Sequence, residues 1–213
     1  MNFIKSTIII LALGALLTAC ATSKTNARFY TLANNLPKGS GENLPVSTPI
    51  AIEILPVNVP ERLKRPQLVI TAKNSAQLKI LEQDRWSSSF NDELQDAFVS
   101  GISQQLNAID ISRGGRISNQ PTYRIAIVLQ HFNATPGEQV QANFGWTITP
   151  LNAGKSSTDN RSLSCQATIS KTVGNDTDAV VKGVQAAVDD AIKAITANVK
   201  ALSNNNSATC ASM

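Results

Sequence analysis

The residues best suited to chemistry in this 213-residue sequence are Leu17-Thr18-Ala19-Cys20, near the N-terminus. A Leu, a small or hydroxylated residue, a small residue and a Cys form a bacterial lipobox, where the cysteine is acylated and the preceding segment is cleaved. Lys5 supplies the positive start of such a signal, and residues 8–17 supply its apolar part. About ten apolar residues are too few for a membrane span, which needs roughly 20. We therefore expect Cys20 to be the first mature residue, carrying a diacylglycerol and an N-acyl chain. An ordinary secretory signal with a coincidental Cys is the alternative.

Catalytic chemistry is poorly represented elsewhere in the chain. His131 is the single histidine, and it could act as a base beside a Ser and an Asp, because such triads are assembled in space. No G-x-S-x-G motif accompanies it, so a structural or rim histidine is the favoured interpretation. The sequence also has no H-E-x-x-H, C-x-x-C, G-x-G-x-x-G or Walker A motif. We expect no metal and no cofactor, and a hydrolase function rests on His131 alone.

Two further cysteines, Cys165 and Cys210, remain in the mature chain. In an extracytoplasmic compartment disulfides persist, and an even number of cysteines permits one bridge without establishing it. The residues from Ser203 to Cys210 can span roughly 25 Å, so a bridge is sterically feasible. The alternative is one buried thiol and one thiol in the tail.

A proline-flanked segment between Pro60 and Gln67 is the candidate partner-facing surface. Prolines there prevent regular strand pairing, while Arg62, Lys64 and Arg65 project positive charge. Such charges steer association, and an apolar neighbour such as Leu63 would supply affinity. The alternative is a plain connection between two strands with solvated charges.

Composition excludes several classes of partner. The sequence has 19 basic and 15 acidic residues and a formal net charge of +4, and no run of basic residues reaches five. Neither nucleic acid nor a polybasic membrane patch is indicated.

Apolar periodicity predicts strands followed by a helix, three further strands and a second helix. Strands are expected at residues 29–32, 50–54, 67–71, 77–81, 123–129, 139–148 and 163–169, and helices at residues 86–106 and 177–202. Ser88 or Ser89 is expected to cap the first helix, and Asp176 or Thr177 the second. For the aromatic residues at helical or strand spacing, core packing is favoured over a lipid-contacting groove. These are Trp86, Phe90, Phe98, Phe144 and Trp146.

Two helices with one apolar stripe each can cover one face of a sheet. The expected fold is therefore α+β, with two layers and a mostly antiparallel sheet. Its other face is left for loops or a partner. The expected organisation is a signal peptide at 1–19, a lipidated tether at 20–28, the α+β domain at 29–202 and a Ser/Asn-rich tail at 203–213.

The order of motifs resembles one family, the ABC-type transport auxiliary lipoproteins, including its paraquat-inducible, PqiC-like members. The resemblance is carried by Cys20, by Phe29-Tyr30-Thr31-Leu32, by the Val57–Val69 segment with its Val-Pro and Arg-Pro-Gln, and by Trp86. Tyr123-Arg124-Ile125, His131-Phe132 and Phe144-Gly145-Trp146 continue it. Ser87-Ser88-Ser89 and the Ser/Asn tail with Cys210 depart from the family pattern.

The resemblance implies a non-enzymatic auxiliary component of an ABC/MCE-type intermembrane lipid transport system. Its implied partners are a periplasmic substrate-binding protein of the MCE class and the inner-membrane transporter. Ala21 rather than Asp follows Cys20, which favours the outer membrane, with the domain facing the periplasm. A periplasmic carrier that encloses phospholipid itself is the alternative, and homo-oligomerisation stays open.

Overall fold

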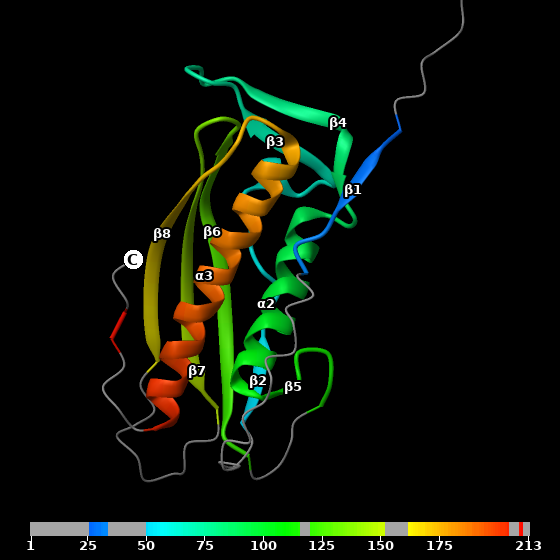
Figure 1. Ribbon diagram of the computed structural model, residues 1–213. Helices are drawn as coiled ribbons and strands as arrows, with labels where there is room; N and C mark the ends of the chain where they lie inside the picture. Colours follow the sequence, from blue (N-terminus) through cyan, green and yellow to red (C-terminus); the bar gives the residue numbers. More distant parts are fainter. Residues whose placement is uncertain (1–25, 34–49, 116–119, 152–161, 205–208, 211–213) are drawn as a thin grey trace, which may run out of the picture.

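The computed structural model describes residues 26–33, 50–115, 120–151, 162–204 and 209–210. In this part of the chain, two long helices pack beside two mixed β-sheets (Figure 1). The expected α+β class is confirmed. A single mostly antiparallel sheet is not what forms, because the strands divide into a five-stranded and a three-stranded sheet.

The larger sheet has the strand order β5-β2-β6-β7-β8. Its antiparallel half is the expected meander of β6 (Thr122–Thr135), β7 (Gln139–Pro150) and β8 (Leu163–Thr172). Its parallel half joins β2 (Ala51–Ile54) to β6 on one side and to the unexpected two-residue β5 (Ile109–Asp110) on the other. Parallel pairing requires a crossover connection, and here the connection from β2 to β6 contains two of the three strands of the small sheet and the first helix.

The smaller sheet has the order β1-β4-β3. β3 (Gln67–Thr71) and β4 (Leu78–Trp86) form the expected hairpin, and β1 (Arg28–Tyr30) pairs in parallel with the end of β4. This sheet lies at one end of the molecule, and the described chain begins there (Figure 1).

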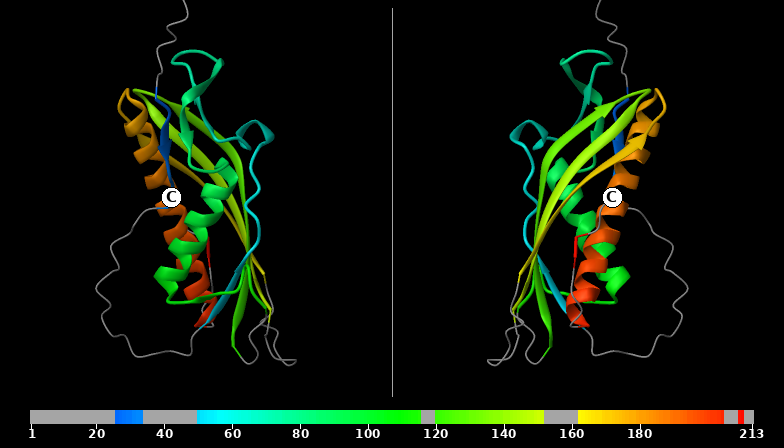
Figure 2. Two further views of the ribbon diagram at one scale, coloured as in Figure 1. Left: turned by 90° about the vertical axis from the view of Figure 1, so that its right-hand side faces the viewer. Right: turned by 90° about the vertical axis from the view of Figure 1, so that its left-hand side faces the viewer.

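Both helices cover the same face of the five-stranded sheet (Figure 2). Helix α2 (Phe90–Leu106) follows the small sheet, with Ser89 as its N-cap residue. Helix α3 (Thr177–Ser203) follows β8, and its N-cap Asp176 accepts a hydrogen bond from the Ala179 amide at 2.7 Å.

The first helix begins later than its apolar stripe predicts. Trp86 ends β4 instead of opening α2, although its ring stacks on that of Phe90 with centroids 5.2 Å apart. The four-residue spacing from Trp86 to Phe90 therefore reflects a core contact between the end of β4 and the start of α2. It does not mean that both residues lie on one helix. The five aromatic residues in question are all buried, so their role in core packing is confirmed.

A β-bulge in β6 changes which residues face the core. The register shifts between Leu129 and His131, so Gln130 is the extra residue. Odd-numbered hydrophobic residues face inward from Tyr123 to Leu129, whereas the even-numbered Ala134 is the buried hydrophobic residue further along. A bulge bends its strand and increases the twist, and the long strands of this sheet are visibly bent (Figure 2).

Pro136-Gly137 forms the turn between β6 and β7, as expected. Gly137 has φ of +75°, and a Cβ built there would lie 2.0 Å from Asn175 Oδ1. Both the backbone conformation and the contact require glycine.

Candidate functional site

The predicted lipobox, Leu17, Thr18, Ala19 and Cys20, lies outside the described residues. The nearest described element is β1, so the first question is how β1 is held to the body.

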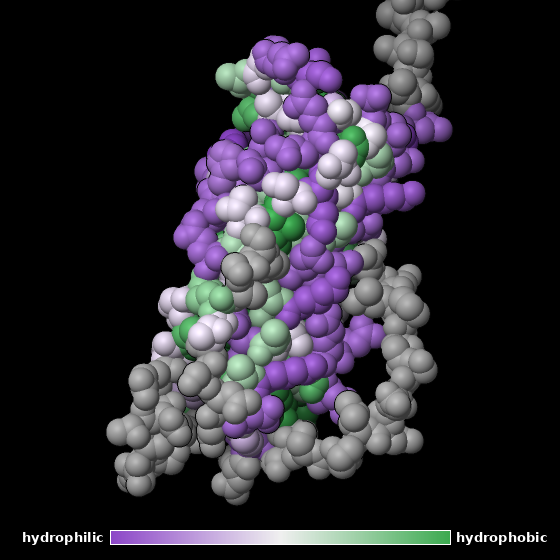
Figure 3. All heavy atoms as spheres, turned by 60° about the vertical axis from the view of Figure 1, so that its left-hand side comes forward, coloured by the Kyte–Doolittle hydropathy of each residue, from purple (hydrophilic) through white to green (hydrophobic). Residues whose placement is uncertain are grey.

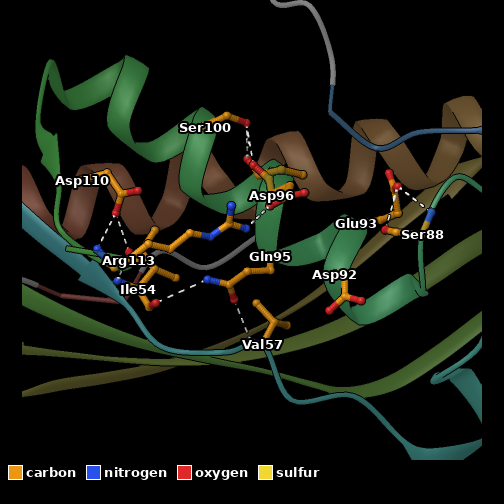
Figure 4. Close-up of polar contacts among 12 residues, drawn as sticks. Ile54, Val57, Ser88, Asp92, Glu93, Gln95, Asp96, Ser100, Asp110 and Arg113 are labelled. Carbon is orange, nitrogen blue, oxygen red and sulfur yellow. Dashed lines mark hydrogen bonds and ion pairs between the residues drawn. The ribbon is translucent and has the colours of Figure 1, made fainter.

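Glu93 on the first turns of α2 is the main attachment point for β1. One carboxylate oxygen accepts hydrogen bonds from the Leu32 amide at 2.8 Å and from Thr31 Oγ1 at 2.9 Å. The other accepts from Ser87 Oγ at 2.5 Å and from the Ser88 amide and hydroxyl at 3.1 and 3.0 Å. Figure 4 shows Glu93 turned toward Ser88. This one side chain therefore joins the segment after β1 to the segment after β4.

Glu93 is only 5% exposed. Burial by itself raises the pKa of its carboxyl, but the hydrogen bonds from Ser87, Leu32, Thr31 and Ser88 outweigh that effect and hold the pKa below its usual value. The sequence indicates Glu93 only as negative charge in the first turn of a helix. Its partners come from two distant segments, and no local pattern identifies them.

A second set of polar contacts joins β1 to β4 and α3. Arg28 Nε donates to Asp84 at 2.6 Å, and the Tyr30 hydroxyl donates to Asp178 at 2.7 Å. Burial and the Asp178 hydrogen bond raise the pKa of Tyr30 to about 12. Gln185 Nε2 donates to the Thr31 carbonyl at 2.9 Å. The strand nearest the predicted anchor is thus fixed to both helices.

Helix α2 also fixes the end of β2. Gln95 accepts a hydrogen bond from the Val57 amide at 2.9 Å and donates one to the Ile54 carbonyl at 3.3 Å (Figure 4). Arg113, which follows α2 in the chain, forms an ion pair with Asp96 of α2 at 2.8 Å. The two Gln95 hydrogen bonds set the course of the chain that leads to the predicted partner-facing segment.

That segment contains a short 3-10 helix, η2 (Glu61–Leu63). The exposed Arg62 donates to the Phe132 carbonyl at 3.4 Å, and Lys64 pairs with Glu61 at 2.8 Å. Arg65 is half-buried, and its Nε has no hydrogen-bond partner within the described residues.

Leu63 does not fit the predicted role of an exposed contact residue. Its side chain is 3% exposed and belongs to the core cluster. It lies beside Trp86, Phe90 and Phe132. The segment presents charge from Arg62 and Lys64, while its leucine holds it to the body.

The face of the five-stranded sheet opposite the helices is uncovered by any described element (Figure 2). We call the outward residues of β6, β7 and β8 the open face. They are Ala126, Val128, Gln130, Gly145, Thr147, Ser164 and Gln166. They line a shallow hollow of about 400 Å³, bordered also by Leu55, Pro56 and Asn58.

Side chains on the open face and directly beside it are organised by cross-strand hydrogen bonds. The Thr147 and Ser164 hydroxyls lie 2.9 Å apart, and Asn143 contacts Thr168 and Gln166 at 2.7 and 2.9 Å. Small and amide side chains that hold one another in place give a rigid, polar and slightly concave surface. Such a surface suits recognition of a protein better than enclosure of a lipid.

Cys165 of β8 is joined to Cys210 by a disulfide, with Cα atoms 5.4 Å apart. Nearby, buried Trp146 donates to Asn198 Oδ1 at 3.0 Å, and Asn198 Nδ2 donates to the Thr209 carbonyl at 3.0 Å. Residues 209–210 are therefore attached to both β8 and α3.

His131 is exposed and lies opposite Asn143 in the β6–β7 ladder. Within the described residues its side chain has no hydrogen bond or ion pair that could prepare it as a base. The same residues contain no group of three potential metal ligands, and neither of their helices is long and apolar enough to cross a membrane.

The two sheets, the two helices and the attached N-terminal strand define an α+β module. Residues 30–196 match the model of the ABC-type transport auxiliary lipoprotein component family, and the chain belongs to that family. It is therefore a lipoprotein component of transport, a membrane-anchored protein of the cell envelope. The family is one of auxiliary components and is not an enzyme family.

Solved structures share the fold. A crystal structure titled as an uncharacterised protein matches with a TM-score of 0.61 and 16% identity, over 82% of this chain and 99% of the other. A Xanthomonas campestris protein of the DUF330 family matches with a TM-score of 0.53 and 14% identity, over 84% and 98%. No curated protein matches the sequence.

Proposed function

We propose that this chain is a non-enzymatic auxiliary lipoprotein of an ABC/MCE-type intermembrane lipid transport system. It is anchored through acylated Cys20 in the outer membrane and faces the periplasm. There it docks the periplasm-spanning MCE-class component, whose inner-membrane transporter supplies the energy. The open face, together with Arg62 and Lys64, forms the docking surface.

One observation carries this proposal: the helix-covered side of the sheet is packed, while the other side is free. The space enclosed by Leu63, Trp86, Phe90 and neighbouring apolar residues measures only about 10 Å³. A pocket for a drug-sized ligand needs roughly 300–1,000 Å³, and a phospholipid is larger still. This part of the core thus has no room for lipid, and the uncovered sheet is a surface available to a partner.

The alternative function is a carrier that encloses phospholipid. Purification of the acylated protein, followed by mass spectrometry of extracted lipids, separates the two functions. A docking protein yields no stoichiometric phospholipid beyond the covalent acyl chains. One tightly bound phospholipid per chain would favour the carrier.

The docking function is tested by capture of the MCE-class protein on the acylated chain. The double variant Arg62→Glu/Lys64→Glu should weaken capture, most strongly at low salt, because exposed charges steer association. Arg65 is left unchanged because it is half-buried. Arg113→Glu/Lys182→Glu makes the same charge change at exposed positions on other surfaces and should leave capture intact. Unchanged capture by a folded Arg62→Glu/Lys64→Glu variant would remove these two residues from the docking surface.

A further inference from the structure

Exposed apolar side chains gather on the small sheet. Of the four large apolar residues that stand out as exposed in the described chain, Phe29, Leu78 and Ile80 lie on β1 and β4, with exposures of 66%, 47% and 44%. The fourth, Ile109, is 40% exposed and lies on β5. The surface is otherwise largely hydrophilic, with small apolar groups that include one at the end carrying the β3–β4 hairpin (Figure 3).

The strand pairing explains why these side chains point outward. Successive residues of a strand face opposite sides. Phe29 precedes half-buried Tyr30, which pairs with buried Trp86. Ile80 precedes Leu81, which pairs with buried Leu68. Phe29 and Ile80 are thus each next to a residue that faces the core, and Leu78 lies two residues before Ile80, on the same face of β4.

The predicted anchor is close to this end of the molecule. Phe29 is nine positions after Cys20 in the sequence, so it lies at most about 30 Å from the acylated residue. Helix α3 starts at the same end, because Tyr30 contacts Asp178 and Thr177 contacts Asp84. Its 27 residues extend about 40 Å away from it. The small sheet therefore lies on the anchor side of the body.

We propose that this end, which we call the membrane-facing end (Phe29, Leu78 and Ile80), rests on the surface of the bilayer that holds the anchor. The inference rests on the proposed acylation of Cys20. Exposed apolar groups next to a lipid anchor are suited to the interfacial region of a membrane. The small sheet and its hairpin turn contain more basic than acidic residues, and this excess favours anionic headgroups. The basic residues are Arg28, Lys73, Lys79 and Arg85, and the acidic ones are Glu82 and Asp84.

Contact with the bilayer would orient the whole body. Glu93, Asp84 and Asp178 fix β1 to both helices, so a membrane-facing small sheet projects α3 and the five-stranded sheet into the periplasm. The open face would then stand clear of the membrane, where a periplasm-spanning partner can reach it.

The test uses the full acylated chain in vesicles of phosphatidylethanolamine and phosphatidylglycerol, with or without brominated phosphatidylcholine as a quencher. Phe29→Trp and Leu78→Trp place an indole at the membrane-facing end, and Ile109→Trp is the matched control on β5. The two native tryptophans are buried and are present in every variant. The fluorescence of each introduced indole is therefore obtained by subtracting the fluorescence of the unsubstituted protein. Brominated lipid should quench the indoles introduced at positions 29 and 78 and leave the one at 109 unchanged.

The outcomes separate this inference from the proposed function. Quenching that is equal at all three positions, or absent at 29 and 78 in vesicle-bound protein, would overturn it. A blue shift at 29 and 78 that depends on protein concentration and persists in detergent would show that a second copy covers this end, which also overturns it. If none of the proteins floats with the vesicles, the acylation of Cys20 itself is contradicted.

Discussion

Glu93 shows how one buried carboxylate can hold an anchored strand to a folded body. Within the described residues its carboxylate accepts five hydrogen bonds. Three come from hydroxyl groups, of Thr31, Ser87 and Ser88, and two come from the backbone amides of Leu32 and Ser88. Hydrogen bonds to a charged group are worth about 1.5–3 kcal/mol each, and a buried group left unpaired is costly. The ionised form of Glu93 is therefore the form that the fold requires.

Replacing Glu93 by Gln should destabilise the protein, because an amide NH₂ would face existing donors. We expect the free energy of unfolding at neutral pH to fall by about 2–4 kcal/mol, measured by urea denaturation. Glu82→Gln, at a side chain that is 65% exposed, is the matched control and should change stability by less than about 0.5 kcal/mol.

The pH dependence follows from the lowered pKa of Glu93. A carboxyl with a depressed folded-state pKa contributes stability above its unfolded-state pKa, and this contribution is lost as the pH falls through the folded-state value. The stability difference between the native chain and Glu93→Gln should thus be full at pH 7 and shrink below pH 4.5, the ordinary value. A difference that stays constant down to pH 2 would contradict this role.

At the scale of elements, β8 is an edge strand, and the tail is bonded to it. An exposed edge can pair with other chains, and the Cys165–Cys210 disulfide holds residue 210 beside this edge. The bridge closes a loop across 45 residues that contains all of α3. It therefore links the last helix covalently to the sheet that the helix covers.

Reduction of this bridge should lower the melting temperature. A chain-entropy account of a loop of this length gives about 4 kcal/mol, which for a domain of this size corresponds to roughly 5–15 °C. Differential scanning calorimetry with and without dithiothreitol measures the shift. Cys210→Ser should melt at the temperature of the dithiothreitol-treated native chain, and adding dithiothreitol should not change its melting temperature. Equal melting of the oxidised native chain and Cys210→Ser would show that the bridge adds no stability.

The elements that were predictable from sequence are those with uninterrupted local patterns. The meander of β6, β7 and β8 and helix α3 follow their alternating or helical apolar periods, and Asp176 caps α3 as expected. The sequence pattern places Trp86 in the first helix because its contact with Phe90, across two elements, has helical spacing. Three features were not predictable because they depend on contacts between residues that are distant in the chain, and local patterns do not indicate such contacts. They are the parallel β2–β6 pairing, the bulge at Gln130 and the burial of Leu63.

On the scale of the whole molecule, the proposed anchor and the proposed docking surface belong to different sheets. The small sheet contains β1, the described strand nearest in sequence to Cys20, and the open face lies on the five-stranded sheet, away from both helices (Figure 2). A packed core between the helices and the sheets separates the two. This division suits a component that positions a partner at a membrane and leaves transport to that partner.

Replacing Cys20 by Ser should remove acylation and release the protein from membranes in soluble or uncleaved form. The native chain should sediment with outer-membrane markers on a sucrose gradient, because Ala21 follows Cys20. Mass spectrometry of its N-terminal peptide should detect the acylated cysteine. A cleaved Cys20→Ser protein that still resists carbonate and salt extraction would refute the anchor, and sedimentation with inner-membrane markers would refute the outer-membrane location.

Photo-crosslinking in living cells tests the docking function most directly. A photoreactive amino acid replaces Gln166 on the open face, and the same replacement of Gln104, exposed on α2, is the control. The account predicts a covalent adduct with the MCE-class protein from position 166 and none from position 104. If a folded, membrane-bound chain gave that adduct from position 104 and not from position 166, the open face would not be the docking surface. If neither position gave it, the docking function itself would be contradicted.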